Sequence, residues 1–249
     1  YERNKLRLHT IPQMNKKDAE FRKNALKEIS DNVLKYQQLQ KQVNDIASTS
    51  LQRNENGFLL KLDKIQALKN KNDILYELFK AYGPFNWIDL FQLLTAINGK
   101  TIFNATHRII KERDGLVLTN NKKNAWQEVF IQTETAEIHY PLTLSFTTLD
   151  KQFVDIKKDA ALAFLDFHSL SFPLQLRKWK HGDVFRPFGM DGTKKISDFM
   201  IDQKFSMIEK ENTWVLCSDD EVVWVVGYRI SQDFKLVAET EKVYLVEPF

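Results

Sequence analysis

The sequence predicts an α+β protein in two parts, an all-helical N-terminal domain followed by a β-rich α+β C-terminal domain. Up to about residue 98 the apolar residues recur at three- and four-residue steps, which is the period of amphipathic helices. Beyond about residue 125 they alternate, and Val, Ile, Phe, Trp and Tyr dominate, as is typical of strands. With 249 residues, of which 43% are hydrophobic, the chain is long enough to form two cores.

The N-terminal part is expected to begin with one long helix. Residues 1–12 form a short basic segment that ends at Pro12, where we expect any helix to break. From residue 13 to residue 48 an apolar stripe that includes Ile29, Val33 and Val43 predicts a long amphipathic helix with a lysine-rich, solvated outer face. We therefore place a helical domain at residues 13–125.

Turn and cap residues divide the rest of this domain. A turn at residues 54–57 precedes a short extended piece at residues 58–62. Gly83 and Gly99 are placed to end two helices. Asn104 or Thr106 is placed to begin a short helix that carries His107, Arg108 and Arg113. The other helices are expected at residues 63–69, 72–82 and 87–98.

The C-terminal domain is placed at residues 126–249. Alternating patterns rich in β-branched and aromatic residues predict its strands. One short helix is expected at residues 196–201. The candidate strands are residues 128–132, 142–147, 162–167, 214–218, 222–228, 235–238 and 242–246.

Composition excludes several classes of function. The net charge of +3 is too mild to predict nucleic-acid binding by itself. No apolar run reaches the roughly 18–20 residues of a membrane helix, and we expect no secretory signal, because no basic stretch of this sequence is followed by an apolar core. Cys217 is the single cysteine, which excludes an internal disulfide and fits a reducing cytosol. Its apolar surroundings predict a buried, inert thiol.

Catalytic and metal motifs are not evident. The five histidines are dispersed without metal-ligand spacing, and no glycine-rich phosphate loop is present. Asp198 and Asp202 lie four residues apart on the expected helix, where pairing with Lys194 and Lys195 explains them better than catalysis does.

Residues that could bind RNA are concentrated between residues 176 and 209. Cations there alternate with flat side chains, and such cations hold phosphates while flat rings stack on exposed bases. For Phe185 and Phe199 a place in the β core is the better interpretation, whereas Trp179 is left open between core and RNA. His107 is equally open between contacting a backbone and packing. The candidate RNA-binding residues are Arg177, Lys178, Trp179, Lys180, Arg186, Lys194, Lys195, Lys204, His107, Arg108 and Arg113.

These stretches resemble the bacterial tRNA(Ile)-lysidine synthetase family. Four segments are similar to its C-terminal domain: Arg177-Lys-Trp-Lys-His-Gly-Asp-Val-Phe-Arg-Pro-Phe-Gly-Met, Lys194-Lys-Ile-Ser-Asp-Phe-Met-Ile-Asp, residues 223–230 and residues 234–240. Thr106-His-Arg resembles a segment of its middle domain, and residues 1–12 resemble the end of its N-terminal ATP-pyrophosphatase domain.

The resemblance implies a fold, a reaction and partners. It implies an SH3-like C-terminal sandwich, as in phenylalanyl-tRNA synthetase, that grips the tRNA acceptor end. The family uses ATP with Mg to adenylate C2 of the wobble cytidine (position 34) of the isoleucine tRNA with a CAU anticodon, and lysine then displaces AMP. Its ATP site needs a Ser-Gly-Gly-x-Asp-Ser loop that is not found in this sequence.

From that difference we expect a tRNA-recognising portion that binds no cofactor and makes no lysidine alone. Lysine and ATP would bind to an N-terminal domain that the sequence does not contain. The resemblance also implies a cytoplasmic protein, away from membranes, in a family whose members can form homodimers. Two alternatives stay open, a stand-alone RNA-binding module and a protein-interaction scaffold whose basic patches are merely solvated.

Overall fold

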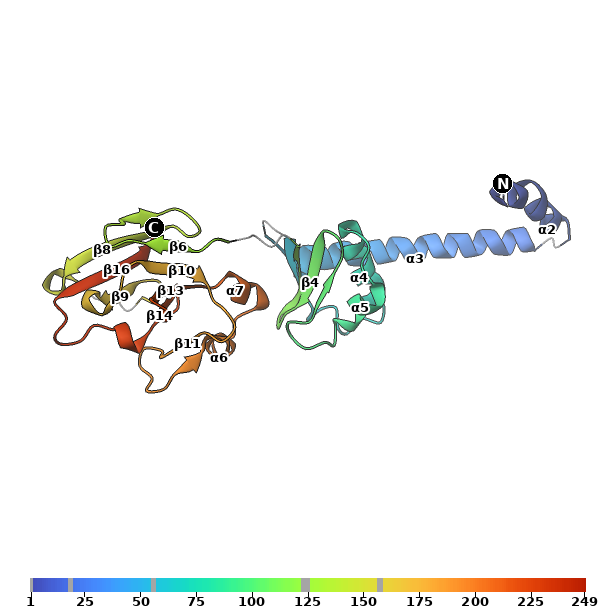
Figure 1. The fold of residues 1–249 in the computed structure, drawn as a ribbon. Coiled ribbons are helices and arrows are strands. Elements are labelled where there is room, and N and C mark those ends of the chain that lie inside the picture. The colour runs from blue at the N-terminus through green and yellow to red at the C-terminus, as the bar shows by residue number, and fades with distance from the viewer. Residues whose placement is uncertain (1, 18–19, 55–56, 122–125, 156–158) are drawn as a thin grey trace. The chain divides into compact units, whose positions relative to one another are not determined.

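A computed structural model describes residues 2–17, 20–54, 57–121, 126–155 and 159–249. The chain forms two compact units, residues 1–122 and 123–249 (Figure 1). Each is considered separately below. None of the described helices is long and apolar enough to cross a membrane.

The first unit begins with helices. Short turns α1 (Glu2–Lys5), a π-helical turn (Leu6–Thr10) and α2 (Ile11–Lys17) precede the long α3 (Phe21–Ser50). The predicted break at Pro12 is wrong, because the helical backbone continues from the π-helical turn through Pro12 into α2. Further on lie α4 (Lys71–Phe79), a 3-10 turn (Lys80–Tyr82) and α5 (Trp87–Gln92).

The apolar stripe of α3 is buried only toward its C-terminal end. Val43 and Ile46 are buried against the core, together with Ile74 and Leu75 of α4. Nearer the N-terminus of α3, apolar side chains from Leu26 to Tyr36, Ile29 among them, are 49–59% exposed. The predicted periodicity is therefore present, but only its last turns form part of the core.

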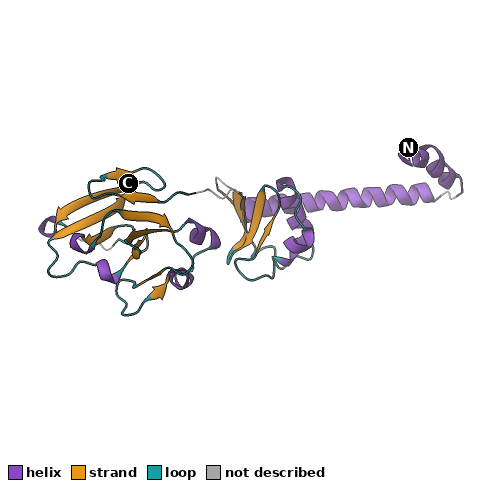
Figure 2. Cartoon of the chain, viewed as in Figure 1, coloured by secondary structure: helices purple, strands orange, loops and turns teal. Residues whose placement is uncertain are grey.

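The prediction of an all-helical first domain is wrong, as Figure 2 shows. This unit contains a five-stranded antiparallel sheet in the order β1-β2-β5-β4-β3. Its strands are β1 (Leu51–Asn54), β2 (Gly57–Lys61), β3 (Thr101–Phe103), β4 (His107–Lys111) and β5 (Gly115–Asn120).

The segment predicted as a helix after Asn104 is the strand β4. Asn104 does accept hydrogen bonds from the backbone N–H groups of Thr106 and His107, as a helix cap would. The chain then pairs with β3 and β5, and Ile109 and Ile110 become fully buried. The capping signal was local, whereas burial between two neighbouring strands decided the structure.

The second unit is β-rich, as predicted. One sheet has the order β15-β14-β13-β10-β6 and another β7-β8-β16-β9. Their inward side chains, among them Leu176, Trp224 and Tyr244, share one core. The strands are β6 (Val129–Ile131), β7 (Glu137–Ile138), β8 (Leu144–Asp150), β9 (Ala163–Asp166), β10 (Leu174–Lys178), β13 (Trp214–Ser218), β14 (Glu221–Val225), β15 (Arg229–Ile230) and β16 (Lys242–Pro248).

The second unit also has a smaller core, which lies beside the sheet that contains β13 and β14. A hairpin of β11 (Val184–Phe185) and β12 (Lys194–Lys195) leads into α6 (Ile196–Asp202), and α7 (Met207–Asn212) follows. Phe185 and Phe199 meet there edge to face, with ring centroids 5.3 Å apart. Their predicted place in the core is confirmed, whereas the strand expected at residues 235–238 is not formed.

Candidate nucleic-acid interface

Arg177 lies at the end of β10 and is turned into the fold. Its guanidinium donates to both carboxylate oxygens of Asp183, with Nη1–Oδ2 at 2.8 Å and Nη2–Oδ1 at 3.0 Å. Both side chains are largely buried. Burial alone would raise the pKa of Asp183, but hydrogen bonds from Arg177 and from the backbone N–H of Lys180 hold it below its usual value. The pair fixes the turn between β10 and β11.

Lys178 is held between two indole rings. Its Nζ lies 4.5 Å from the ring centroid of Trp214 and 5.5 Å from that of Trp126. The Nζ atom is itself buried and has no hydrogen-bond partner among the described residues. Burial lowers the pKa of this ammonium to about 8, while the charge of Glu211 opposes the shift. Lys178 therefore packs within the unit and presents little charge to its surface.

Trp179 takes part in the same internal packing. Its indole N–H donates to the backbone carbonyl of Lys210 at 2.6 Å, and its ring packs against the smaller core. That bond links β10 to α7. Among the predicted residues of this stretch, three consecutive ones thus organise the fold.

Three other predicted lysines are free on the surface. Lys180, Lys195 and Lys204 have exposed side chains that make no hydrogen bond or ion pair within the described part of the chain. Lys195 is the cross-strand neighbour of Val184 in the hairpin. The adjacent Lys194 differs, because it is half-buried and forms an ion pair with Asp202. The expected lysine pairing is therefore found for Asp202, across eight residues and not four, whereas Asp198 forms no ion pair with a lysine among the described residues.

Arg186 lies in the loop that follows β11. The residues that contact this loop were not among the RNA-binding residues predicted from the sequence. Arg186 forms an ion pair with Asp233, at 3.0 Å between Nη2 and Oδ1. β15 and the turn after it line the same loop. Gln232 of the turn accepts a hydrogen bond from the N–H of Gly189 at 2.9 Å, and Arg229 of β15 donates to the carbonyl of Phe188 at 3.5 Å. Arg229 is exposed. Its place in the stretch 223–230 was the available signal.

The predicted residues of the first unit lie around β4. His107 is half-buried, contacts the hydroxyl of Thr106 through Nδ1 at 2.8 Å and meets the ring of Tyr82 edge to face. Packing therefore accounts for one side of its ring. Arg108 is half-buried, and Arg113 is exposed in the turn after β4. These three residues belong to one unit, and the residues from 177 to 204 belong to the other.

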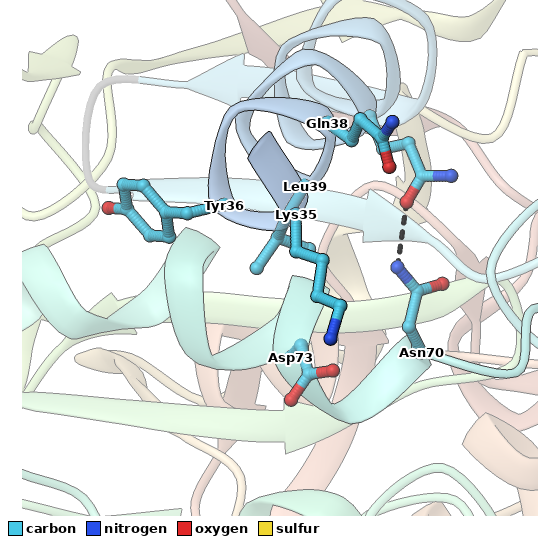
Figure 3. Close-up of a pocket in the computed structure, with 7 residues that line it drawn as sticks. Lys35, Tyr36, Gln38, Leu39, Asn70 and Asp73 are labelled. Atoms are coloured by element: carbon cyan, nitrogen blue, oxygen red, sulfur yellow. Dashed lines mark hydrogen bonds between the residues drawn. The ribbon is translucent and has the colours of Figure 1, made fainter. Parts of the chain in front are cut away.

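The first unit also has an open pocket of about 430 Å³ between α3 and α4 (Figure 3). Tyr36, Leu39, Gln42 and Asn70 are among the residues that line it. The side chain of Asn70 donates a hydrogen bond to that of Gln42 at 2.7 Å. Lys35 and Asp73 bring opposite charges to it. Because these charges oppose each other, the pocket lacks the uniformly positive lining that would attract a phosphate. Among the described residues no group of three His, Cys, Asp or Glu side chains could hold a metal ion.

The structure thus shows a protein of two units. A mixed α/β unit is followed by a β-rich unit that presents free cations beside exposed apolar side chains. Comparison with known proteins agrees. The family model for the TilS substrate binding domain matches residues 52–122, and the model for the TilS substrate C-terminal domain matches residues 174–246. Together they cover more than half of the chain. The chain belongs to the tRNA(Ile)-lysidine synthase (TilS) family and contains its substrate-binding and C-terminal domains.

Curated relatives carry the same family name. The tRNA(Ile)-lysidine synthase of Parabacteroides distasonis is 45% identical over 179 residues, which are 70% of this chain and 40% of the relative. That of Bacteroides thetaiotaomicron is 29% identical over 98% of this chain and 55% of the relative. The chain thus spans about half the length of these relatives.

One solved structure is also similar. A crystal structure of the TilS C-terminal domain aligns with a TM-score of 0.42 and 19% identity, and the alignment covers 49% of this chain and 95% of that chain.

Proposed function

We propose that this chain is the tRNA-recognising portion of a tRNA(Ile)-lysidine synthase. The observation that carries the proposal is the presence, in one chain and in this order, of the family's substrate-binding and C-terminal domains. The substrate we propose is the isoleucine tRNA with a CAU anticodon, in the cytoplasm. The SH3-like character of the second unit stays a prediction.

The reaction that we propose for the complete enzyme is the ATP-dependent ligation of lysine to C2 of the wobble cytidine. ATP with Mg would activate that carbon, and the lysine amine would form the new C–N bond. The sequence has no glycine-rich phosphate loop, and the chain spans about half the length of its curated relatives. We therefore assign ATP, Mg and lysine to a part of the enzyme that this sequence does not contain, and we expect this chain alone to be inactive.

The role left to this chain is to hold tRNA. Cations that have no carboxylate partner can neutralise phosphates without breaking an existing ion pair. In the second unit Lys180, Lys195 and Lys204 meet this condition within the described residues. We propose these three as phosphate contacts, with Arg113 as the exposed candidate in the first unit.

The test is a titration of the chain with transcripts of the CAU isoleucine tRNA and of a tRNA with another anticodon, at several salt concentrations. We expect preference for the first and a linear fall of log K with log salt. Lys195→Ala should weaken binding and reduce the salt slope by roughly 0.7–0.9, the contribution of one phosphate contact. Lys194→Ala is the matched control, since Lys194 is already paired with Asp202.

Other results would favour the two alternatives. Equal, salt-dependent binding of both tRNAs would indicate a general RNA-binding module. An absence of binding at moderate salt would contradict the proposal and favour an interaction scaffold.

A further inference from the structure

We propose that the loop Arg186–Met190 is a stacking site for an unpaired nucleotide of tRNA, in which Phe188 takes the base and Arg229 the adjoining phosphate. This inference rests on the proposed function and deepens it. The loop lies between β11 and β12, and Figure 1 shows β11 at the edge of the second unit.

The backbone of this loop is held in one shape. The N–H of Phe188 donates to the carbonyl of Ile230 at 3.0 Å, and that of Gly189 donates to the Gln232 side chain at 2.9 Å. In return, the N–H of Gln232 donates to the carbonyl of Arg186 at 2.6 Å. The residues after β15 thus act as a template along the loop. A tethered loop of this kind loses little entropy when a ligand binds.

Two apolar side chains of the loop nevertheless point to solvent, whereas Pro187 between them and β11 is buried. Phe188 is 46% exposed and Met190 is 45% exposed, whereas Phe185, three residues earlier, is 4% exposed. The ring of Phe188 makes no ring–ring contact with any described residue, unlike Phe185, which packs on Phe199. A rigid loop that holds a phenyl ring in water offers a free face for stacking.

The charges around the ring suit an anion. Arg229 is exposed, and its guanidinium donates to the backbone carbonyl of Phe188 at 3.5 Å, which places the cation against the backbone of the loop. The carboxylates of Asp183 and Asp233 are already paired with Arg177 and Arg186. Asp191, which directly follows the loop, is exposed. The loop thus combines an exposed ring with a guanidinium that has no carboxylate partner among the described residues, and such a pair can bind a single-stranded nucleotide by stacking and by a phosphate contact.

The experiment compares Phe188→Ala and Phe188→Tyr with the unaltered chain. Phe153→Ala is the matched control, because Phe153 is 74% exposed in the same unit. Three probes are used: the CAU isoleucine tRNA transcript, a single-stranded RNA octamer and a blunt RNA duplex. We expect Phe188→Ala to weaken binding of the tRNA and the octamer by roughly 5- to 100-fold, the range for one lost stacking contact. Phe188→Tyr keeps the ring and should stay within about two-fold.

Duplex binding should not change in any of these variants. Unaltered tRNA and octamer affinity in Phe188→Ala, or an equal loss for the duplex, would overturn the stacking site while leaving tRNA recognition intact. If the unaltered chain bound no tRNA, the proposed function would fall. The octamer would then still decide the inference: binding that depends on Phe188 supports the site, and no octamer binding overturns it.

Discussion

Arg177 and Asp183 form a two-pronged ion pair, with donor–acceptor distances of 2.8 and 3.0 Å, beneath the surface of the second unit. The sequence places Arg177 among RNA-contacting cations, but its guanidinium serves the fold. Asp183 also accepts the N–H of Lys180, so the pair shapes the turn that leads to the exposed Lys180 and into the β11–β12 hairpin. The buried Arg177 therefore helps to position the exposed Lys180 and the hairpin.

Arg177→Ala should destabilise the second unit by about 3–5 kcal/mol, because it leaves the Asp183 charge buried without a partner. Thermal or urea unfolding measures this change. Lys180→Ala, at an exposed position three residues away, is the control and should change the free energy of unfolding by no more than about 0.5 kcal/mol. Similar stability of the two variants would show that the pair contributes little.

The same pair predicts a dependence on acid. Because the pKa of Asp183 is lower in the folded chain than its ordinary value of 3.8, the unfolded chain binds the proton first as the pH falls. The stabilisation is therefore complete above about pH 4 and is lost as the pH falls through the folded pKa. In Asp183→Asn the deficit in unfolding free energy relative to the unaltered chain should be constant near neutral pH and shrink below pH 4. A deficit independent of pH would contradict this.

Lys178 should affect stability at alkaline pH but not RNA binding. Burial lowers the pKa of Lys178 to about 8 from 10.5, so between these values the unfolded chain binds more protons than the folded one. Its contribution thus makes stability rise with pH across that window. Lys178→Met should abolish that rise and leave tRNA affinity unchanged. Lys180→Met, at the exposed position two residues on, should keep the rise in stability and weaken tRNA binding. A binding titration and unfolding curves at pH 7, 8 and 10 measure both effects.

Gly189 should be needed for the shape of the Arg186–Met190 loop. Its φ of +86° lies in the left-handed region, while an added Cβ would meet no atom within 4 Å. The cost of Gly189→Ala is therefore one of backbone strain, about 1–2 kcal/mol. We expect weaker binding of the RNA octamer, because Phe188 shifts with the backbone. Gly192→Ala, where a Cβ also has open space and φ is not left-handed, should bind normally.

Cys217 should be unreactive in the native protein. It is fully buried in β13, and burial raises the pKa of its thiol to about 11. A thiol reagent at pH 8 should label it only when denaturant unfolds the chain. Rapid labelling without denaturant would contradict the expectation of an inert core residue.

Much of the second unit could be predicted from the sequence. The strand at residues 214–218 and the helix after Lys195 lie where the patterns put them, because each contains a run whose period matches its structure. In the first unit the prediction failed at β4. There Asn104 offers the same capping hydrogen bonds to a turn as to a helix, and only pairing with β3 and β5 distinguishes them.

The sequence by itself determined the kinds of groups available: the β-rich second unit, the cations and rings between residues 177 and 204, and the resemblance to a tRNA-modifying family. Tertiary structure decided which of these groups are free. Lys194 and Lys195 are adjacent, yet one is paired with Asp202 and the other is open to solvent. Phe185 is buried and Phe188 is exposed. The reason is physical, since a charge or a ring is free only if no partner reaches it, and its partners lie on elements that are distant in the sequence.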